Sequence, residues 1–257
     1  MQTGLSAASL LVIGGAAVAA GLVNAIAGGG SLISFPVLTA VGLPAVTANL
    51  TNTVALLPGY GGAALAQRRD LSGQRGRALL LLPPAALGGL LGAELLLLSG
   101  EALFGVLVPW LILLGTGLLA VQEPLRRWLP AKQGHLNRQR LERAAVLPVF
   151  LVSIYGGYFG AGLSVILLAV LGLLLNDSLT RLNGLKQGLA LQVNLAAALL
   201  FVASGKLDWP ATIVMALGSL FGGLLGGRLA SRINPAQLRA VVLVLGLAVG
   251  LTFLLQQ

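Results

Sequence analysis

The segment LGGLLGAEL at residues 87–95 recurs as FGGLLGGRL at residues 221–229, an offset of 134 residues. Two shorter pairs keep almost the same offset: Gly28-Gly29-Gly30 with Gly160-Ala161-Gly162, and Asn52 with Asn183. Because the separation nearly agrees in all three pairs, we interpret the chain as a duplication. Its expected parts are a first repeat at 1–121, a connecting basic loop at 122–142 and a second repeat at 143–257.

The composition around these segments is that of a membrane protein. Of the 257 residues, 57% are hydrophobic and 9% are charged, and the mean hydropathy is +0.94. A soluble domain carries about 25% charged residues, so this chain cannot cover a water-facing surface. The absence of cysteine excludes disulfides and thiolate-bound metal. With a single histidine, His135, in a polar stretch, we expect no metal and no cofactor.

Glycine, proline and charge clusters divide the chain into ten apolar stretches. A transmembrane helix needs about 20 apolar residues, and several stretches have this length whereas others are shorter. We therefore predict an all-α polytopic membrane protein. The predicted stretches are 8–27, 31–43, 45–67, 78–99, 101–121, 144–158, 161–175, 178–205, 209–230 and 236–256.

The basic residues predict the orientation, because lysine and arginine collect in cytoplasmic loops. They cluster after the third stretch, in the central loop and before the last stretch: Arg68, Arg69, Arg75, Arg77, Arg126, Arg127, Lys132, Arg138, Arg140, Arg143, Arg228, Arg232 and Arg239. We place these segments in the cytoplasm, and both termini and the connections at 99–101 and 205–209 outside. The net charge of +9 is thus assigned to topology, and no nucleic-acid partner is expected.

With the sides of these segments assigned, the number of membrane crossings requires 8–43 and 144–175 to be hairpins. Each hairpin enters and leaves the membrane on the same side. Each half becomes a broken-helix hairpin plus three spans, so the two copies have opposite orientations. Inverted-topology repeats are the architecture of secondary transporters, with substrate bound near the midplane. An old duplication without a transport role is the alternative interpretation.

Glycine clusters mark the two hairpin turns, with Gly28, Gly29 and Gly30 in the first and Gly160 and Gly162 in the second. Broken backbone at membrane depth is tolerated where it is buried or lines a watery cavity. The N–H groups at a helix start can cradle an anion. Close helix packing is an equally plausible role for these glycines.

Lys186 is the principal candidate for binding, because it lies about 12 Å into the stretch 178–205. A charge at such depth indicates function by default. Polar residues around Lys186, on the matching stretch of the first half and beside the breaks complete the candidate binding set: Asn183, Gln187, Asn49, Thr51, Asn52, Asn24, Ser31, Tyr155 and Tyr158. Hydroxyls, amides and one cation without a nearby acid suit an oxyanion.

Other features receive a structural interpretation. Glu94 is the single carboxylate well inside a predicted span, and we interpret it as a side chain that reaches back to the membrane surface. The spacing of Gly88 and Gly92, and of Gly218, Gly222 and Gly226, is typical of close helix packing.

Several motifs resemble the sulfite exporter TauE/SafE family, also called toluene sulfonate uptake permeases. They are the stretch from Asn24 to Gly30 leading to Pro36, YGGYFGAG at 155–162, NGLK at 183–186 and GKLDW at 205–209. Gly184 stands where the usual motif has alanine. The resemblance covers nearly the whole chain and implies transport of sulfite, sulfonates or related organosulfur anions across a prokaryotic inner membrane.

The sequence thus favours a secondary transporter of a small anion. Transport of another small anion, such as a carboxylate, is the first alternative, and an intramembrane enzyme is the second. An enzyme would need a Ser/His, metal or paired-carboxylate arrangement, which the sequence does not offer at depth. A scaffold without transport is the third. The expected partners are the small anion and the lipid bilayer, with a homodimer as a candidate assembly.

Overall fold

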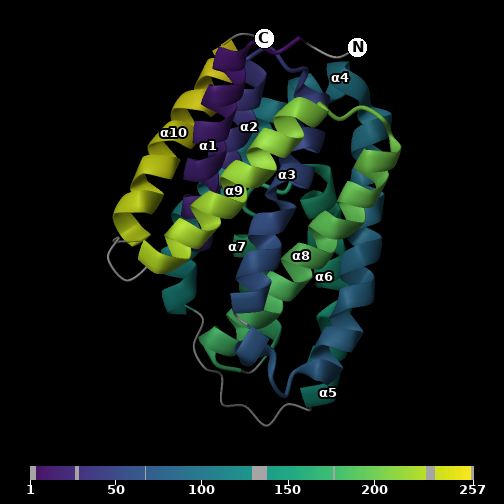
Figure 1. Cartoon of the computed structure of the whole chain (residues 1–257). Coiled ribbons are helices and arrows are strands. Elements are labelled where there is room, and N and C mark those ends of the chain that lie inside the picture. Colours follow the sequence, from purple (N-terminus) through teal and green to yellow (C-terminus); the bar gives the residue numbers. More distant parts are fainter. Residues whose placement is uncertain are drawn as a thin grey trace.

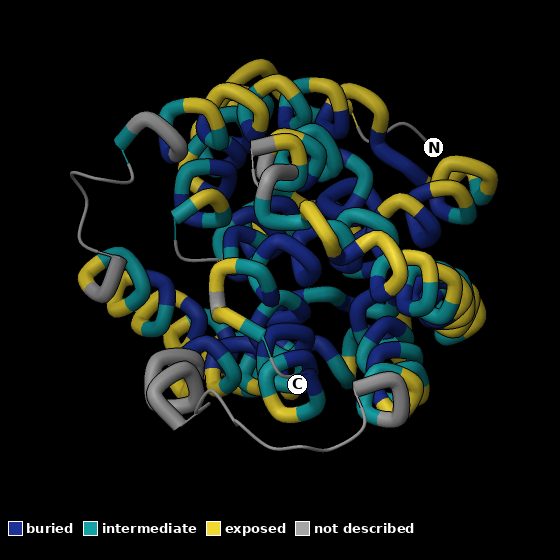
Figure 2. Tube along the Cα trace, turned by 90° about the horizontal axis from the view of Figure 1, so that it is seen from below, coloured by how far each residue is buried: buried dark blue, intermediate teal, exposed yellow. Residues whose placement is uncertain are grey.

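The computed structural model describes residues 4–26, 29–66, 68–128, 138–175, 177–229 and 235–255, and in this part of the chain every regular element is helical. Figure 2 shows exposed residues around the rim of the bundle and buried residues at its centre. The large exposed side chains include many leucines and valines, among them Leu11, Leu98 and Leu199. The all-α prediction is confirmed, and an apolar rim of this extent suits contact with lipid.

The described segments that are long and apolar enough to cross a membrane number five: Ala7–Ile26, Arg75–Val121, Thr180–Ala203, Trp209–Gly226 and Gln237–Leu255. One of them, Arg75–Val121, has 47 residues, roughly twice what a single span requires. The expectation of a polytopic membrane protein therefore holds.

The first half begins with a hairpin. Helix α1 (Ala7–Ile26) descends from one end of the bundle, and α2 (Ser31–Ala40) returns toward that end (Figure 1). Helix α3 (Ala45–Ala66) then descends to the short helix η1 (Arg68–Leu71) at the opposite end. At 1.5 Å per residue, the 20 residues of α1 match a core of about 30 Å, whereas the 10 residues of α2 do not.

Helix α4 (Arg75–Trp128) consists of two arms joined at Gly100. Gly100 has φ 66° and ψ 178°, a left-handed φ that glycine tolerates better than other residues. The sequence prediction of two spans that meet at 99–101 is thus confirmed. The second arm continues to Trp128, beyond the expected end at 121, and α5 (Arg138–Ala144) begins within the expected loop 122–142 and ends two residues after it. Arg, Gln, Leu, Glu and Ala in α5 are all good helix formers.

The second half begins with a hairpin of two short helices. Helices α6 (Val146–Tyr158) and α7 (Leu163–Leu174) form the second hairpin, with 13 and 12 residues, or about 20 and 18 Å. Both are too short for a full span. Helices α8 (Leu179–Ala203), α9 (Trp209–Leu229) and α10 (Pro235–Leu255) follow.

The helix directions place the first and last helix ends of the chain at one end of the bundle and the basic segments at the other. The start of α1 and the end of α10 lie at the upper end of the bundle in Figure 1, whereas η1, the start of α4 and α5 lie at the lower end. The segment at 68–77 and the described part of the central basic segment are therefore on the opposite side from the two termini.

Glycines fit the two halves against each other. Helix α1 packs along α9, and α6 packs along α4. On α9, a Cβ added at Gly218, Gly222 or Gly226 would meet the backbone carbonyl of Gly14, Val18 or Leu22 on α1. On α4, a Cβ added at Gly88 or Gly92 would meet the carbonyl of Phe150 or Ile154 on α6. The packing interpretation of these glycines is confirmed.

Candidate functional site

The polar residues of α3 each contact a different helix or turn of the bundle. The amide nitrogen of Asn49 donates to the carbonyl of Tyr158, at the end of α6, over 2.9 Å. The hydroxyl of Thr51 accepts from the backbone N–H of Asp208. The Ser34 hydroxyl, on α2, donates to the amide oxygen of Asn52. Asn49, Thr51 and Asn52 are all buried, so these side chains hold the bundle together besides lining its interior.

The polar residues of α8 are also buried, and α8 starts from the end of the bundle opposite to the start of α3 (Figure 1). Lys186 is 8% exposed, and Gln187 is equally buried, whereas Asn183 is partly exposed. Lys186 lies about 10 Å into α8, and a Cβ added at nearby Gly184 would meet Asp70 of η1 at 2.8 Å. Helices α3 and α8 pack against each other in the middle of the bundle (Figure 1). A buried lysine here costs at least about 2.5–3.5 kcal/mol on insertion scales.

The first break lies between α1 and α2. Gly28 falls outside the described residues, but Gly29 has φ 87°. The carbonyl of Ala20 fills the space that a Cβ on Gly30 would need, and Asn24 lies beside Gly30. The side chain of Ser31 pairs with Tyr60 of α3. Among the described residues, the N–H groups of Gly29, Gly30 and Ser31 donate no hydrogen bond.

The second break, between α6 and α7, has the same character. Gly160 and Gly162 both have φ 78°, and the Tyr155 hydroxyl donates to the carbonyl of Ala161 over 2.5 Å. Within the described part of the chain, the N–H groups of Ala161 and Gly162 donate to no acceptor, although both residues are buried. Each break therefore combines close packing with N–H groups that donate to no described acceptor, so the two roles expected for the glycines are compatible.

Aromatic rings hold the second break in place. Phe159, in the break, packs edge-on against Phe35 of α2 with ring centroids 5.4 Å apart. Phe104 of α4 contacts both Phe35 and Tyr158, and the Tyr158 hydroxyl lies 3.0 Å from that of Ser99. The second break is thus fixed by rings from the first half of the chain.

The second arm of α4 meets both breaks. A Cβ added at Gly29 would lie 3.2 Å from the side chain of Leu119, and one at Gly162 would lie 3.4 Å from Leu118. Because Leu118 and Leu119 are consecutive, the two breaks approach the same turn of one helix. Sequence reasoning had grouped the breaks only through the repeat, and it had no signal for this shared support.

Other buried polar residues were missed from sequence. Asp208, in the connection at 205–209, is 7% exposed, and its carboxylate accepts from the N–H of Ala211 and caps α9. The run Asp208-Trp209-Pro210 has the aspartate and early proline typical of a helix start, which could have indicated this role. Tyr60 carries no comparable sequence signal. Glu94 is exposed, in line with its structural interpretation.

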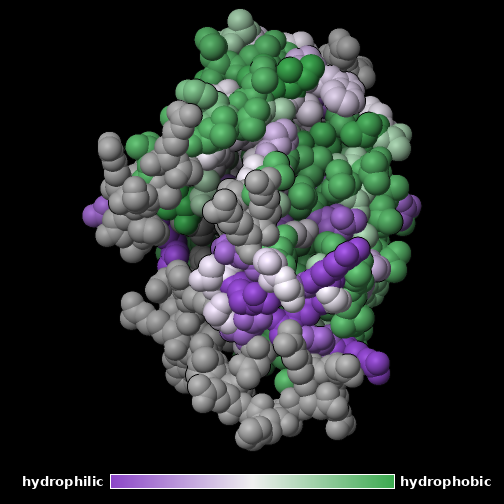
Figure 3. Space-filling view, turned by 60° about the horizontal axis from the view of Figure 1, so that its bottom comes forward, coloured by the Kyte–Doolittle hydropathy of each residue, from purple (hydrophilic) through white to green (hydrophobic). Residues whose placement is uncertain are grey.

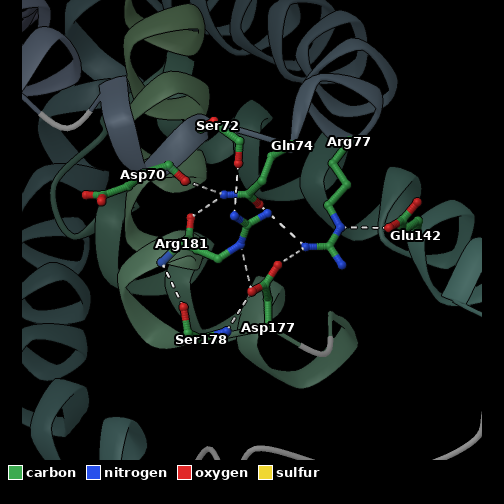
Figure 4. Close-up of polar contacts among 8 residues, drawn as sticks. All are labelled: Asp70, Ser72, Gln74, Arg77, Glu142, Asp177, Ser178 and Arg181. Atoms are coloured by element: carbon green, nitrogen blue, oxygen red, sulfur yellow. Dashed lines mark hydrogen bonds and ion pairs between the residues drawn. The ribbon is translucent and has the colours of Figure 1, made fainter.

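A partly buried ion-pair network lies at the lower end of the bundle (Figure 4). Arg77, 3% exposed, contacts Glu142 of α5 at 2.7 Å and Asp177, before α8, at 2.5 Å. Asp177 also pairs with Arg181 at 2.9 Å. Gln74 donates to the carbonyls of Asp70 and Arg181. The sequence placed Arg77 in a cytoplasmic loop as a topological charge, whereas in the structure it joins the two halves.

The electrostatics of this network favour an ionised Asp177. Burial acts to raise the pKa of its carboxyl group. Hydrogen bonds from Arg181, the N–H of Ser178 and Arg77 outweigh that effect and hold the pKa below its usual value. Figure 3 shows hydrophilic side chains gathered on this face, bordered by hydrophobic surface. Among the described residues, no group of three or more His, Cys, Asp or Glu side chains is placed to hold a metal ion.

Comparison with known proteins identifies the family. The profile of the family described as Sulfite exporter TauE/SafE matches residues 13–253. The chain belongs to the TauE/SafE family. This TauE/SafE protein is accordingly a membrane transporter, and the resemblance seen in its motifs is confirmed. A transporter assignment fits the expectation that the chain is not an enzyme.

Similar curated proteins carry matching names. A "Probable membrane transporter protein" of Haemophilus influenzae is 28% identical over 229 residues, covering 88% of this chain and 87% of the relative. "Probable membrane transporter protein YfcA" of Escherichia coli K12 is 26% identical over 237 residues, covering 89% and 83%. "Probable membrane transporter protein ORF9" of a Sinorhizobium species is 27% identical over 252 residues, covering 93% and 90%. No solved structure matches this TauE/SafE protein.

Proposed function

We propose that this protein is a secondary transporter of small anions, with sulfite, sulfonates or related organosulfur compounds as substrates. The observation that carries the proposal is Lys186, a lysine 8% exposed within the bundle. A substrate anion would offset its charge, and a charge-assisted hydrogen bond to it contributes about 1.5–3 kcal/mol. Asn183 and Gln187 lie on the same helix and would supply amide groups to the same anion.

The two breaks would supply the rest of the site. The N–H groups of Gly29, Gly30 and Ser31, and of Ala161 and Gly162, donate to no described acceptor and would replace the water around an oxyanion. Asn24, Ser31, Tyr155 and Tyr158 flank these N–H groups, and Asn49, Thr51 and Asn52 extend the polar interior along α3. In this proposal one anion passes between the breaks and Lys186, and Gly28 belongs to the proposed binding set.

Alternating access between two inverted repeats is the proposed mechanism. Its support is the exchange of partners between the halves: α1 packs on α9 and α6 on α4, while α3 contacts α8. These pairings are those that a two-fold axis in the membrane plane would generate. Rocking of one repeat against the other would then expose the site to each side in turn.

The proposed setting is the inner membrane of a prokaryote, with both termini outside and the basic segments in the cytoplasm. The proposed repeats are 1–121 and 143–257, connected by the basic segment 122–142. A homodimer is the proposed assembly. The carboxylate alternative rests on the same site, because carboxylates and sulfonates are both small oxyanions, and the substrate panel below separates the two.

Transport in proteoliposomes tests the proposal. Purified protein is reconstituted, and uptake of labelled sulfite, methanesulfonate and acetate is measured with and without an ion gradient. We expect sulfite or sulfonate uptake, and Lys186→Met should weaken apparent affinity by about tenfold or more. Lys206→Met removes an exposed lysine and serves as the matched control. Parental uptake by a folded Lys186→Met variant would place the site elsewhere, and acetate alone as substrate would replace the sulfur assignment.

A further inference from the structure

The side-chain amide of Asn49 has a fixed orientation. Its nitrogen donates to the carbonyl oxygen of Tyr158 over 2.9 Å. A flipped amide would place two acceptor oxygens against each other, because a carbonyl cannot donate. The amide oxygen, Oδ1, must therefore point away from Tyr158.

This oxygen is buried without a donor. Asn49 is 1% exposed, and Oδ1 receives no hydrogen bond from any described residue. Its polar neighbours are engaged elsewhere, Thr51 with the N–H of Asp208 and Asn52 with Ser34. Because buried polar groups in folded proteins almost always have a partner, the unpaired oxygen indicates that the partner comes from a bound molecule.

The position of Asn49 connects this oxygen to the proposed anion path. Tyr158 is the last residue of α6, directly before the second break. The N–H groups of Ala161 and Gly162 that donate to no described acceptor follow three and four residues later. The region thus combines N–H donors, which bind anionic oxygens, with one acceptor, which would repel them.

We propose that Asn49 is a specificity-determining residue that selects small anions carrying a hydrogen-bond donor of their own. Such an anion places its charged oxygens on the N–H groups and its hydroxyl on Asn49 Oδ1. A hydroxyalkanesulfonate has this pattern, whereas a simple alkanesulfonate leaves the oxygen unpaired. The inference rests on the proposed function and adds the substrate class to it.

Two anions of equal charge and nearly equal size provide the test. Isethionate carries a hydroxyl group, and propane-1-sulfonate carries a methyl group in its place. Each is titrated as a competitor of labelled sulfite uptake into proteoliposomes. We expect isethionate to inhibit at about tenfold lower concentration in the wild-type protein, since a site built to pair a hydroxyl rejects analogues without one.

Variants assign the preference to Asn49. Asn49→Leu is close in size and removes the acceptor, so we expect the two anions to inhibit equally. Asn49→Ser is the second variant, because its short side chain cannot reach the same position. Asn194→Leu is the matched control: Asn194 is also a buried asparagine, but its amide donates within α8 to Ala190. We expect this control to retain the preference.

The outcomes separate the inference from the proposed function. Failure of both anions, and of sulfite itself, to be transported or to compete would overturn the proposed function. Competition by both anions at equal concentration in the wild type, alongside sulfite uptake, would overturn only the role of Asn49. A preference for isethionate that persists in Asn49→Leu and Asn49→Ser would also overturn the role of Asn49, since another group would then accept the hydrogen bond from the hydroxyl.

Discussion

The guanidinium of Arg77 lies 2.5 Å from the carboxylate of Asp177, although one hundred residues separate them along the chain. Arg77 opens the first arm of α4, and Asp177 precedes α8, so this ion pair joins the two halves of the protein at the end that carries the basic segments. Replacement of Arg77 would remove its ion pairs with Glu142 and Asp177, two partly buried carboxylates, while Asp177 keeps its pair with Arg181.

Replacement of Arg77 should therefore destabilise the folded protein. Arg77→Ala is expected to lower the Tm in detergent, because a hydrogen bond to a charged group contributes about 1.5–3 kcal/mol to stability. Arg75→Ala, two residues away and exposed, is the control and should leave the Tm almost unchanged. Equal Tm values for the two variants would show that the network contributes nothing to stability.

The stability of this network should depend on pH in one direction. The folded-state pKa of Asp177 lies below its ordinary value of 3.8, so its contribution is fully present above that value. The contribution is lost as the pH falls through the folded-state pKa. Thermal unfolding of the wild type and Asp177→Asn, compared from neutral pH down to about pH 3, should show a Tm difference that shrinks at the acidic end. A constant difference would contradict the assignment.

Adjacent glycines on α9 should respond in opposite ways to the same substitution. A Cβ at Gly222 would overlap the carbonyl of Val18 on α1, whereas a Cβ at Gly223 meets nothing within 4 Å. Gly222→Ala should lower the Tm. Gly223→Ala should leave it unchanged or raise it, because alanine favours a helix over glycine by up to about 1 kcal/mol. A higher Tm for Gly222→Ala would disprove the close packing.

Lys186→Arg should separate charge from shape at the proposed site. The guanidinium keeps the positive charge but is larger and presents its donors in a plane. We expect uptake of the labelled sulfur anion between that of the wild type and that of Lys186→Met. Uptake as low as in Lys186→Met, from a folded protein, would show that the shape of the ammonium group matters more than its charge.

Reporter fusions test the proposed orientation. A reporter active only in the cytoplasm, fused after Gln257, should be inactive, and the same reporter inserted in the 122–142 segment should be active. The basis is the distribution of lysine and arginine. Cytoplasmic activity at the C-terminus would reverse the proposed topology.

The sequence predicted the helices well because hydrophobic length and glycine breaks are local signals. The turn at Gly100 and the broken segments after Ile26 and Tyr158 all follow from such signals. Helix α5 was missed because a short charged helix lacks an apolar face, and its contact with Arg77 through Glu142 depends on a distant segment.

The candidate site was predictable in its residue types but not in its contacts. Lys186 and the α3 polar residues are buried, as their place in apolar stretches indicated. That Asn52 is engaged by Ser34, and Asn49 by a backbone carbonyl of the other half, depends on which helices pack together. A sequence alone does not supply this, because inter-helix pairing is set by complementary shape rather than by local pattern.

Because α1 packs on α9 and α6 packs on α4, each half of the chain covers helix surfaces of the other half. Expressed as separate chains cut within 122–142, neither half would cover its glycine-lined grooves, because the matching helix belongs to the missing fragment. Co-expressed, the fragments would assemble by complementation, and each alone would be degraded, which immunoblots of singly and jointly expressed fragments would reveal. A gene encoding one half would therefore need a partner chain with the matching helices in order to yield a stable protein.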